Sequence, residues 1–162
     1  MVAAYEAGDA RFGASMATVY TNAATGEVVS ARYIRKFLSQ PFQPNDADNN
    51  WPVLRYADVL LMLAEAMGPS TEAWDLIDEV RARAGLGPVT RDNDTFYEQL
   101  LQERRVELAF ENHRWPDLLR FDAQYGLSIN DTFDEVGRTP SRLLFPIPQR
   151  EVDVAGMEQN DL

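Results

Sequence analysis

The chain contains no cysteine, a single histidine and a single lysine, and it has no long run of apolar residues. The lack of cysteine excludes disulfides and thiolate metal sites, although it does not identify a cellular compartment. No segment approaches the ~18 consecutive apolar residues of a membrane-spanning helix. Residues 1–6 have neither the basic nor the apolar region of a signal peptide. We therefore expect either a cytoplasmic protein or a fragment of a longer one.

Basic residues are also scarce, with 15 Lys and Arg against 26 Asp and Glu. The resulting net charge of -11 excludes nucleic acid as a partner, because binding a duplex requires cations that neutralise its phosphates. Hydrophobic residues nevertheless make up 45% of the sequence, with three Trp, six Tyr and eight Phe. This composition predicts a folded chain with a real core, and 162 residues correspond to one domain.

Apolar residues recur at helical spacing in four segments. They predict helices over residues 52–67, 72–84, 95–111 and 115–125. Gly68 and Pro69 leave so short a link between the first two that these must form an antiparallel αα-hairpin. Near the start, Asn22–Gly26 separates two β-rich segments and predicts a β-hairpin. The predicted fold is mainly α, with a small β-hairpin and long irregular loops.

The remaining segments are rich in polar residues, proline or glycine. We predict loops over residues 39–50 and 126–142, an extended apolar segment over 143–148 and a polar tail over 149–162. Oxygen ligands alternate between Asn45 and Asn50, as in a Ca²⁺ loop. That loop lacks the Gly and the terminal Glu of an EF-hand, so we predict a solvated turn and no metal site.

The stretch from Glu103 to Phe121 combines acids and arginines with apolar flanks. Three of its glutamates follow at i+4 steps, so they share one helix face. They repel each other unless nearby cations neutralise their charges. The apolar flanks favour a partly buried network over a solvated charged face. We predict that Arg104, Arg114 and Arg120 supply the cations and hold two helices together. The predicted structural ion network is Glu103, Arg104, Glu107, Glu111, Arg114, Asp117 and Arg120.

No catalytic constellation is recognisable. His113 has no nucleophile pattern around it, and a general base needs a positioned partner and a cleft. Glu103 and Glu107 superficially resemble the carboxylate pair of a glycoside hydrolase. With arginines nearby, both should be ionised and paired, and therefore unable to act as an acid. We predict a non-enzymatic protein with no catalytic residue, no cofactor and no metal; a glycoside hydrolase stays open as an alternative.

Several motifs together resemble the SusD/RagB family of outer-membrane nutrient-binding lipoproteins. Residues 55–66 are similar to its signature helix, and residues 103–120 to its most characteristic motif, Glu-Arg-x-x-Glu-Leu-x-x-Glu-x-x-Arg-x-x-Asp-Leu-x-Arg. The other matching segments are 9–11 with 33–37, 80–86 and 144–148 with 158–160. Five matches in the family's order cover nearly the whole chain. The departures at Asn112 and Phe121 keep a left-handed backbone and a large ring where the family has Gly and Trp.

The resemblance implies a role and a position within a longer protein. Family members bind glycans or peptides without catalysis, at the cell surface, over a SusC-like TonB-dependent transporter. They begin with a lipid anchor and earlier tetratricopeptide-like helix pairs, which we do not recognise here, and we expect this chain to carry the last such pair, a tetratricopeptide-like αα-hairpin. The chain resembles a single C-terminal domain over 1–162, divided into hairpin and loop (1–50), helix pair (51–88), charged helix pair (94–125) and irregular tail (126–162). Such a piece should expose apolar surface.

Aromatic residues in loops are the candidates for contacting an oligosaccharide or other nutrient. We predict Tyr20, Trp51, Tyr125 and Phe133 as ligand-binding residues. Trp51 precedes a helix, so packing into its core competes with a binding role. Trp74 and Trp115 are expected in the core. Besides the glycoside hydrolase, a helical-repeat scaffold that binds protein but no glycan is an alternative. An apolar groove along residues 52–84 would favour that alternative.

Overall fold

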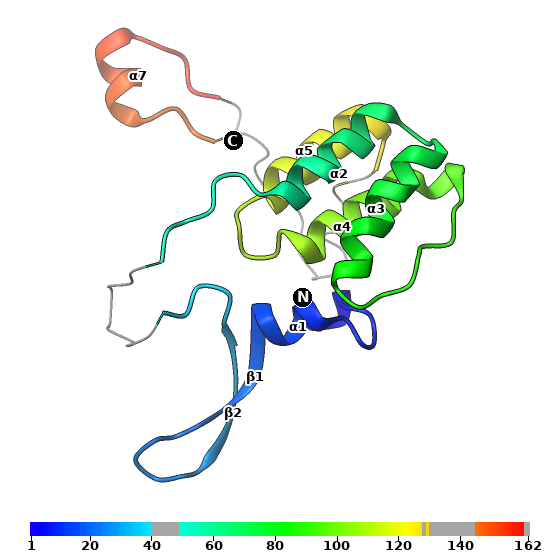
Figure 1. Cartoon of the computed structure of the whole chain (residues 1–162). Coiled ribbons are helices and arrows are strands. Elements are labelled where there is room, and N and C mark those ends of the chain that lie inside the picture. The colour runs from blue at the N-terminus through cyan, green and yellow to red at the C-terminus, as the bar shows by residue number, and fades with distance from the viewer. Residues whose placement is uncertain (40–48, 128, 130–144, 161–162) are drawn as a thin grey trace. The chain divides into compact units, whose positions relative to one another are not determined.

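The structure is a computed structural model that describes residues 1–39, 49–127, 129 and 145–160 (Figure 1). The chain divides into two compact units, Met1–Asp117 and Leu118–Leu162. This division does not decide whether residues 1–162 act as one domain, which stays a prediction. Most of the predicted loops over 39–50 and 126–142 lie outside the described residues, and so do most of the predicted Asn45–Asn50 turn and Phe133. The mainly helical fold with a β-hairpin is confirmed.

The first unit begins with two short helical turns that the sequence pattern did not predict. A 3₁₀ turn covers Val2–Ala4, and helix α1 covers Ala10–Ser15. The side chain of Asp9 caps α1 by accepting a hydrogen bond from the backbone N–H of Arg11 at 2.9 Å. An N-cap of this kind satisfies one of the donors that a helix start leaves unpaired, so six residues suffice for a turn of helix here.

The predicted β-hairpin is confirmed. Strands β1 (Met16–Thr21) and β2 (Val28–Ile34) pair antiparallel, with an irregularity in the register after Ala17. In the connecting loop, the backbone carbonyl of Asn22 accepts a hydrogen bond from the N–H of Gly26 at 2.8 Å. Gly26 has φ +70°, the left-handed conformation for which glycine carries no steric cost.

The predicted αα-hairpin is also confirmed, with a later start. Helix α2 covers Tyr56–Met67 and helix α3 covers Thr71–Arg83. The prediction that α2 begins at residue 52 is wrong, because Arg55 still has an extended backbone at φ -131° and ψ 151°. Leu54, which lies before the observed start of the helix, is 71% exposed. Ser70 caps α3 by accepting a hydrogen bond from the N–H of Ala73 at 3.2 Å.

The core of the first unit is formed by one face of each of three helices. The ring of Trp74 meets that of Phe96 edge to face, with 4.8 Å between the centroids, and its Nε1 donates to Asn93 Oδ1 at 3.2 Å. Trp74 is therefore the core residue that the sequence predicted. The other buried apolar residues of these helices include Ala57, Leu60, Leu61, Ala64, Ala73, Ile77, Val80, Leu100 and Val106.

Helix α4 (Phe96–Glu107) is shorter than the predicted helix over 95–111. A 3₁₀ turn over Asn93–Thr95 precedes it, and Thr95 makes no side-chain cap bond. The helix ends where Leu108 turns to ψ 20°. Phe110 and Asn112 then both adopt a positive φ, of 68° and 65°. For Asn112 the sequence predicted this conformation.

Helix α5 (Arg114–Tyr125) runs from the first unit into the second. In the second unit, helix α7 (Gln149–Ala155) occupies part of the tail that was expected to be irregular. Its C-terminus is closed by Gly156 at φ 63°. Gln159 then bonds both the N–H and the carbonyl of Ile147, at 2.8 and 3.0 Å. No helix in the described parts of the chain is long and apolar enough to span a membrane.

Candidate functional site

Three glutamates form a buried row, which we call the carboxylate row. Glu103 and Glu107 lie one turn apart on α4, and Glu111 lies in the turn that follows it. Their exposed fractions are 3%, 3% and 4%. The prediction that all three share a helix face is wrong for Glu111, because the helix has already ended. The predicted burial of the three glutamates is confirmed.

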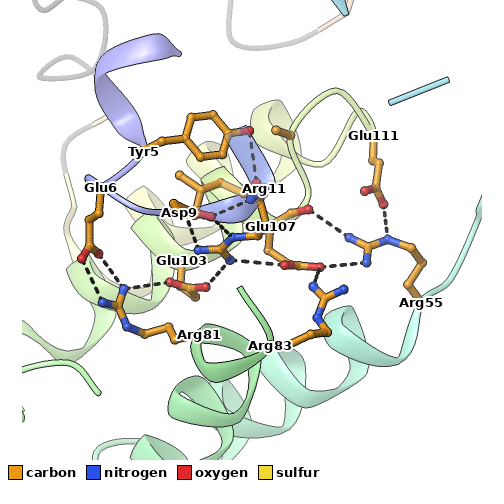
Figure 2. Close-up of polar contacts among 12 residues, drawn as sticks. Tyr5, Glu6, Asp9, Arg11, Arg55, Arg81, Arg83, Glu103, Glu107 and Glu111 are labelled. Atoms are coloured by element: carbon orange, nitrogen blue, oxygen red, sulfur yellow. Dashed lines mark hydrogen bonds and ion pairs between the residues drawn. The ribbon is translucent and has the colours of Figure 1, made fainter. Parts of the chain in front are cut away.

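Each glutamate of the row contacts two or more cations. Figure 2 shows arginines from three other segments of the first unit converging on Glu103 and Glu107. Glu103 Oε1 accepts from Arg11 Nη1 at 2.5 Å, and its Oε2 accepts from Arg81 Nη1 at 3.3 Å. Glu107 accepts from Arg11 Nη1 at 3.2 Å on Oε2. Its Oε1 accepts from Arg55 Nη1 at 2.8 Å and from Arg83 Nη2 at 2.5 Å.

The third glutamate, Glu111, connects the row to the segment that follows strand β2. Glu111 Oε2 accepts from Arg55 Nε at 2.8 Å, and its Oε1 forms an ion pair with Lys36 Nζ. Lys36 Nζ also donates to the backbone carbonyl of Glu107 at 3.0 Å, and so does Arg55 Nη2, also at 3.0 Å. These bonds fasten the segment before α2 and the segment after β2 to the end of α4. They also satisfy a carbonyl of the last helical turn.

The sequence did not pair the carboxylate row with the cations that contact it, which are Arg11, Lys36, Arg55, Arg81 and Arg83. The sequence paired the row with Arg104, Arg114 and Arg120. Arg104 instead binds Asp117 with two parallel hydrogen bonds, at 2.9 and 3.0 Å, and Asp58 at 2.8 Å. Arg104 and Asp117 are thus partners in a second buried network, and Asp58 is a member that the sequence reading missed. Helical geometry gives the reason: consecutive positions on α4 point about 100° apart, so Arg104 faces away from Glu103.

Arg114 and Arg120 stay predictions as network members. Arg114 is the first residue of α5, and Arg120 lies in the second unit. The guanidinium of Arg120 lies over the ring of Phe121, 4.8 Å from its centroid, which is a cation–π contact.

The arginines of the row are themselves held by further acids. Arg11 binds Asp9 through Nε and Nη2, at 2.9 and 2.8 Å, and Arg81 binds Glu6 through both terminal nitrogens, at 2.6 and 3.0 Å. Sequence spacing offered a signal only for Asp9 and Arg11, which are two residues apart. The other partners come from distant parts of the chain. The network therefore joins α1, α3 and α4 into one unit.

The electrostatic environment differs between the two glutamates of α4. Burial raises the pKa of the Glu103 carboxyl above its usual range, and Arg11 and Arg81 offset only part of that effect. Burial acts in the same direction on Glu107, but its arginine partners outweigh it and hold its pKa below the usual value. The pKa of Asp9 is lowered too, because hydrogen bonds from Arg11 outweigh its burial.

This geometry does not suit the chemistry of a glycoside hydrolase. Such an enzyme needs two carboxyl groups that flank a bound sugar, one of them able to give up a proton. Glu103 and Glu107 are buried and each is bonded to at least two arginines. A carboxylate that is bonded to several guanidinium groups fixes the relative positions of the segments that carry those groups. The row can orient helices and the segments attached to them.

The predicted aromatic candidates lie in different settings. Tyr20 is 42% exposed on β1, opposite Val29 of β2. Trp51 is 49% exposed, and its ring stacks on Phe37 with 4.7 Å between centroids and 25° between planes. Trp51 thus packs against one ring while part of its surface stays accessible. Packing of Trp51 and binding of a ligand by Trp51 therefore do not exclude each other. Whether either residue binds ligand stays a prediction.

The other two candidates do not belong to the first unit. Tyr125 ends α5 in the second unit, where its ring meets Phe121 edge to face at 5.2 Å. Phe133 lies outside the described residues.

Sequence reasoning also missed the setting of Trp115. It was expected in the core, but it lines a cavity of about 370 Å³ together with Leu108 and Phe110.

Comparison with known proteins identifies the relatives of this chain. The model of the SusD family matches residues 4–162. SusD-like protein P38 of Formosa agariphila is 33% identical over 143 residues, which are 78% of this chain and 27% of that protein. A SusD superfamily protein from Parabacteroides distasonis has 32% identity and a TM-score of 0.78, covering 98% of this chain and 40% of that chain. Surface glycan-binding protein A from Bacteroides uniformis has 26% identity and a TM-score of 0.74, covering 99% and 39%. The chain therefore spans about a quarter of the length of the curated relatives it matches.

Proposed function

The chain belongs to the SusD family, as its motifs predicted, and on that premise we propose that it is part of a glycan-binding protein of the outer membrane. In this proposal it is non-catalytic and surface-exposed, and it captures an oligosaccharide or other nutrient. A SusC-like TonB-dependent transporter then receives the ligand. The observation that carries the proposal is the match over nearly the whole chain to a surface glycan-binding protein.

The geometry supports a passive role in binding. Glu103 and Glu107 of α4 are held by ion pairs inside the first unit, so they fix its helices and leave recognition to its loops. Trp51, stacked on Phe37, is 49% exposed and offers an accessible aromatic surface. A ring of this kind suits the apolar C–H face of a sugar, and the stack holds it in one orientation before the ligand arrives.

A binding assay with variants tests this function. The 162-residue chain is applied to an array of defined neutral and acidic oligosaccharides, and the affinity for each hit is measured by calorimetry. We expect Trp51→Ala to weaken binding about tenfold, as for loss of one aromatic contact. Tyr20→Ala and Tyr125→Ala test the other described candidates, and Asp75→Ala on the exposed side of α3 is the matched control. Absence of binding to every glycan would contradict the proposal.

The alternative of a scaffold that binds protein has one observation in its favour. The outward side of α2, within the predicted 52–84 hairpin, exposes large apolar residues. Exposed apolar patches mark interaction surfaces. A scaffold would keep this surface open for a separate protein and would show no glycan binding, so the same array separates the two functions.

A further inference from the structure

The cavity beside Trp115 lies where α4 ends and α5 begins. Its volume of about 370 Å³ falls within the range of small-molecule sites, which is about 300–1,000 Å³. Leu108, Phe110 and Trp115 line its apolar part. The turn between the helices holds Phe110 at φ 68°, a conformation that is costly for a bulky residue and that clusters at ligand sites. This strained turn places Phe110 in the wall of the cavity.

The lining of the cavity is cationic, although the chain as a whole is acidic. Acids outnumber bases by 26 to 15 in the sequence, yet three arginines line the cavity, and no Asp or Glu of the described residues does. Arg104 is already bonded to Asp58 and Asp117, which offset its charge. Arg105 and Arg114 bring two further guanidinium groups, each with five N–H donors. Arg114 is also the first residue of α5, where the helix dipole adds partial positive charge. This lining favours an anion.

The apolar and the cationic parts of the lining together select a ligand class. A guanidinium binds a carboxylate through two parallel hydrogen bonds, and an aromatic side chain such as Trp115 packs against the C–H face of a sugar ring. Asn112, which is exposed at the same turn, has an amide that bonds hydroxyl groups. A neutral sugar would leave the cations without an acid, and a small inorganic anion would leave the aromatic wall uncovered. A uronic acid combines the carboxylate, the hydroxyl groups and the C–H face in one ring.

We propose that this cavity binds a uronic acid residue of the captured oligosaccharide. The inference rests on the proposed glycan binding, but it uses residues other than Trp51, so the two can fail separately. If only neutral oligosaccharides bind, and bind through Trp51, the proposed function stands and the acid site is excluded. If no glycan binds, both fall.

The first test compares uronic acid oligosaccharides with their methyl esters, which keep the ring and remove the charge. Calorimetry with the 162-residue chain should show about tenfold tighter binding of the free acid, because only the free acid forms charge-assisted hydrogen bonds. When the free acid is added to isotope-labelled protein, the backbone amide NMR signals of residues 108–115 should shift most. That measurement locates the site without any substitution.

Substitutions then assign the preference for the acid to the cavity. Arg105→Ala should abolish the tenfold preference for acid over ester. Arg105→Lys keeps the charge but loses the planar fork, so it should restore part of the preference. Trp115→Ala should weaken acid and ester alike, provided that thermal unfolding shows a folded variant. Arg32→Ala is the matched control, because it removes the same charge from an exposed position on β2.

Four outcomes would overturn the proposal. The first is equal affinity for acid and ester. The second is an equal effect of Arg105→Ala and Arg32→Ala, because the preference would then come from the overall charge. The third is a set of amide shifts that leaves residues 108–115 unchanged, because the acid would then bind elsewhere. The fourth is binding of sulfated oligosaccharides in place of uronic acids, because the recognised anion would then not be a carboxylate.

Discussion

The first unit buries a network of charged side chains beside its apolar core, while one side of its exterior is apolar. Glu103, Glu107 and Glu111 are nearly inaccessible, yet Tyr56 and Leu63 on α2 are 70% and 48% exposed. Charged residues are rarely buried unless they are paired, and large apolar patches are rare on the surface of a monomer. Buried ions require compensation at close range, so the carboxylate row fixes the relative positions of α1, α3 and α4 strictly. The exposed apolar side of α2 makes no specific bonds to other segments, so it constrains the rest of the first unit weakly. The interior therefore specifies the fold, and the exterior specifies what the fold can join.

The largest effect is expected where the interior network loses one carboxylate. Glu107→Ala removes the partner of Arg11, Arg55 and Arg83. Breaking a buried pair by removing one side costs about 3–5 kcal/mol, because the remaining charge is left uncompensated. We expect a loss of that order in the free energy of unfolding measured with urea.

A matched exposed pair provides the control for that measurement. Asp75 is exposed and pairs with the exposed Arg91 at 2.6 Å. An exposed ion pair of this kind contributes little to stability, so Asp75→Ala should leave the unfolding free energy nearly unchanged. Equal losses in the two variants would show that burial does not distinguish the network from the surface.

A smaller effect should separate the two glutamates of α4 by pH. The folded pKa of Glu107 lies below its ordinary value of 4.5, so its contribution to stability is present above pH 4.5 and is lost as pH falls. The folded pKa of Glu103 lies above 4.5, so its contribution is present below pH 4.5 and is lost as pH rises through the folded pKa. The two residues thus have opposite signs.

Glutamine variants read out those signs. Glu107→Gln should flatten the dependence of unfolding free energy on pH below 4.5. Glu103→Gln should leave that range unchanged and make stability rise more steeply with pH above 4.5. Urea unfolding at intervals from pH 3.5 to 6.5 measures both. If both substitutions alter the same pH range in the same direction, the assigned environments of Glu103 and Glu107 are wrong.

The sequence predicted the parts of this contrast that depend on local spacing. The β-hairpin and the αα-hairpin follow from turn residues and apolar periodicity, and the burial of Glu103 and Glu107 follows from their apolar flanks. The partners did not follow. Arg11 and Glu103 are 92 residues apart, and Arg55 and Glu107 are 52 apart. A pairing between distant segments depends on the packed fold, which spacing alone does not contain.

The ends of helices were predictable only where a strong signal stops them. Gly68 closes α2 with φ 68°, and the prediction placed that end correctly. At the end of α4 the helical pattern continues to Glu111, although the backbone leaves the helix at Leu108. The turn after α4 still brings Glu111 within reach of Arg55 and Lys36. Glu111 therefore forms its ion pairs although it does not belong to the helix. Tertiary contacts of this kind override local propensity.

The smallest effect on stability is expected at the exposed apolar residues of α2, which Leu63 represents. Leu63 is 48% exposed, and glutamate is nearly as good a helix former as leucine, so Leu63→Glu in the isolated chain should change the unfolding free energy by about 0.5 kcal/mol or less. Leu61, two residues earlier and fully buried, is the matched position on the inner face, where the same substitution places an unpaired charge in the core. Thermal unfolding of the two variants measures the difference. A large loss in Leu63→Glu would mean that Leu63 is already covered within this chain, and the contrast between a specified interior and an open exterior would then be wrong.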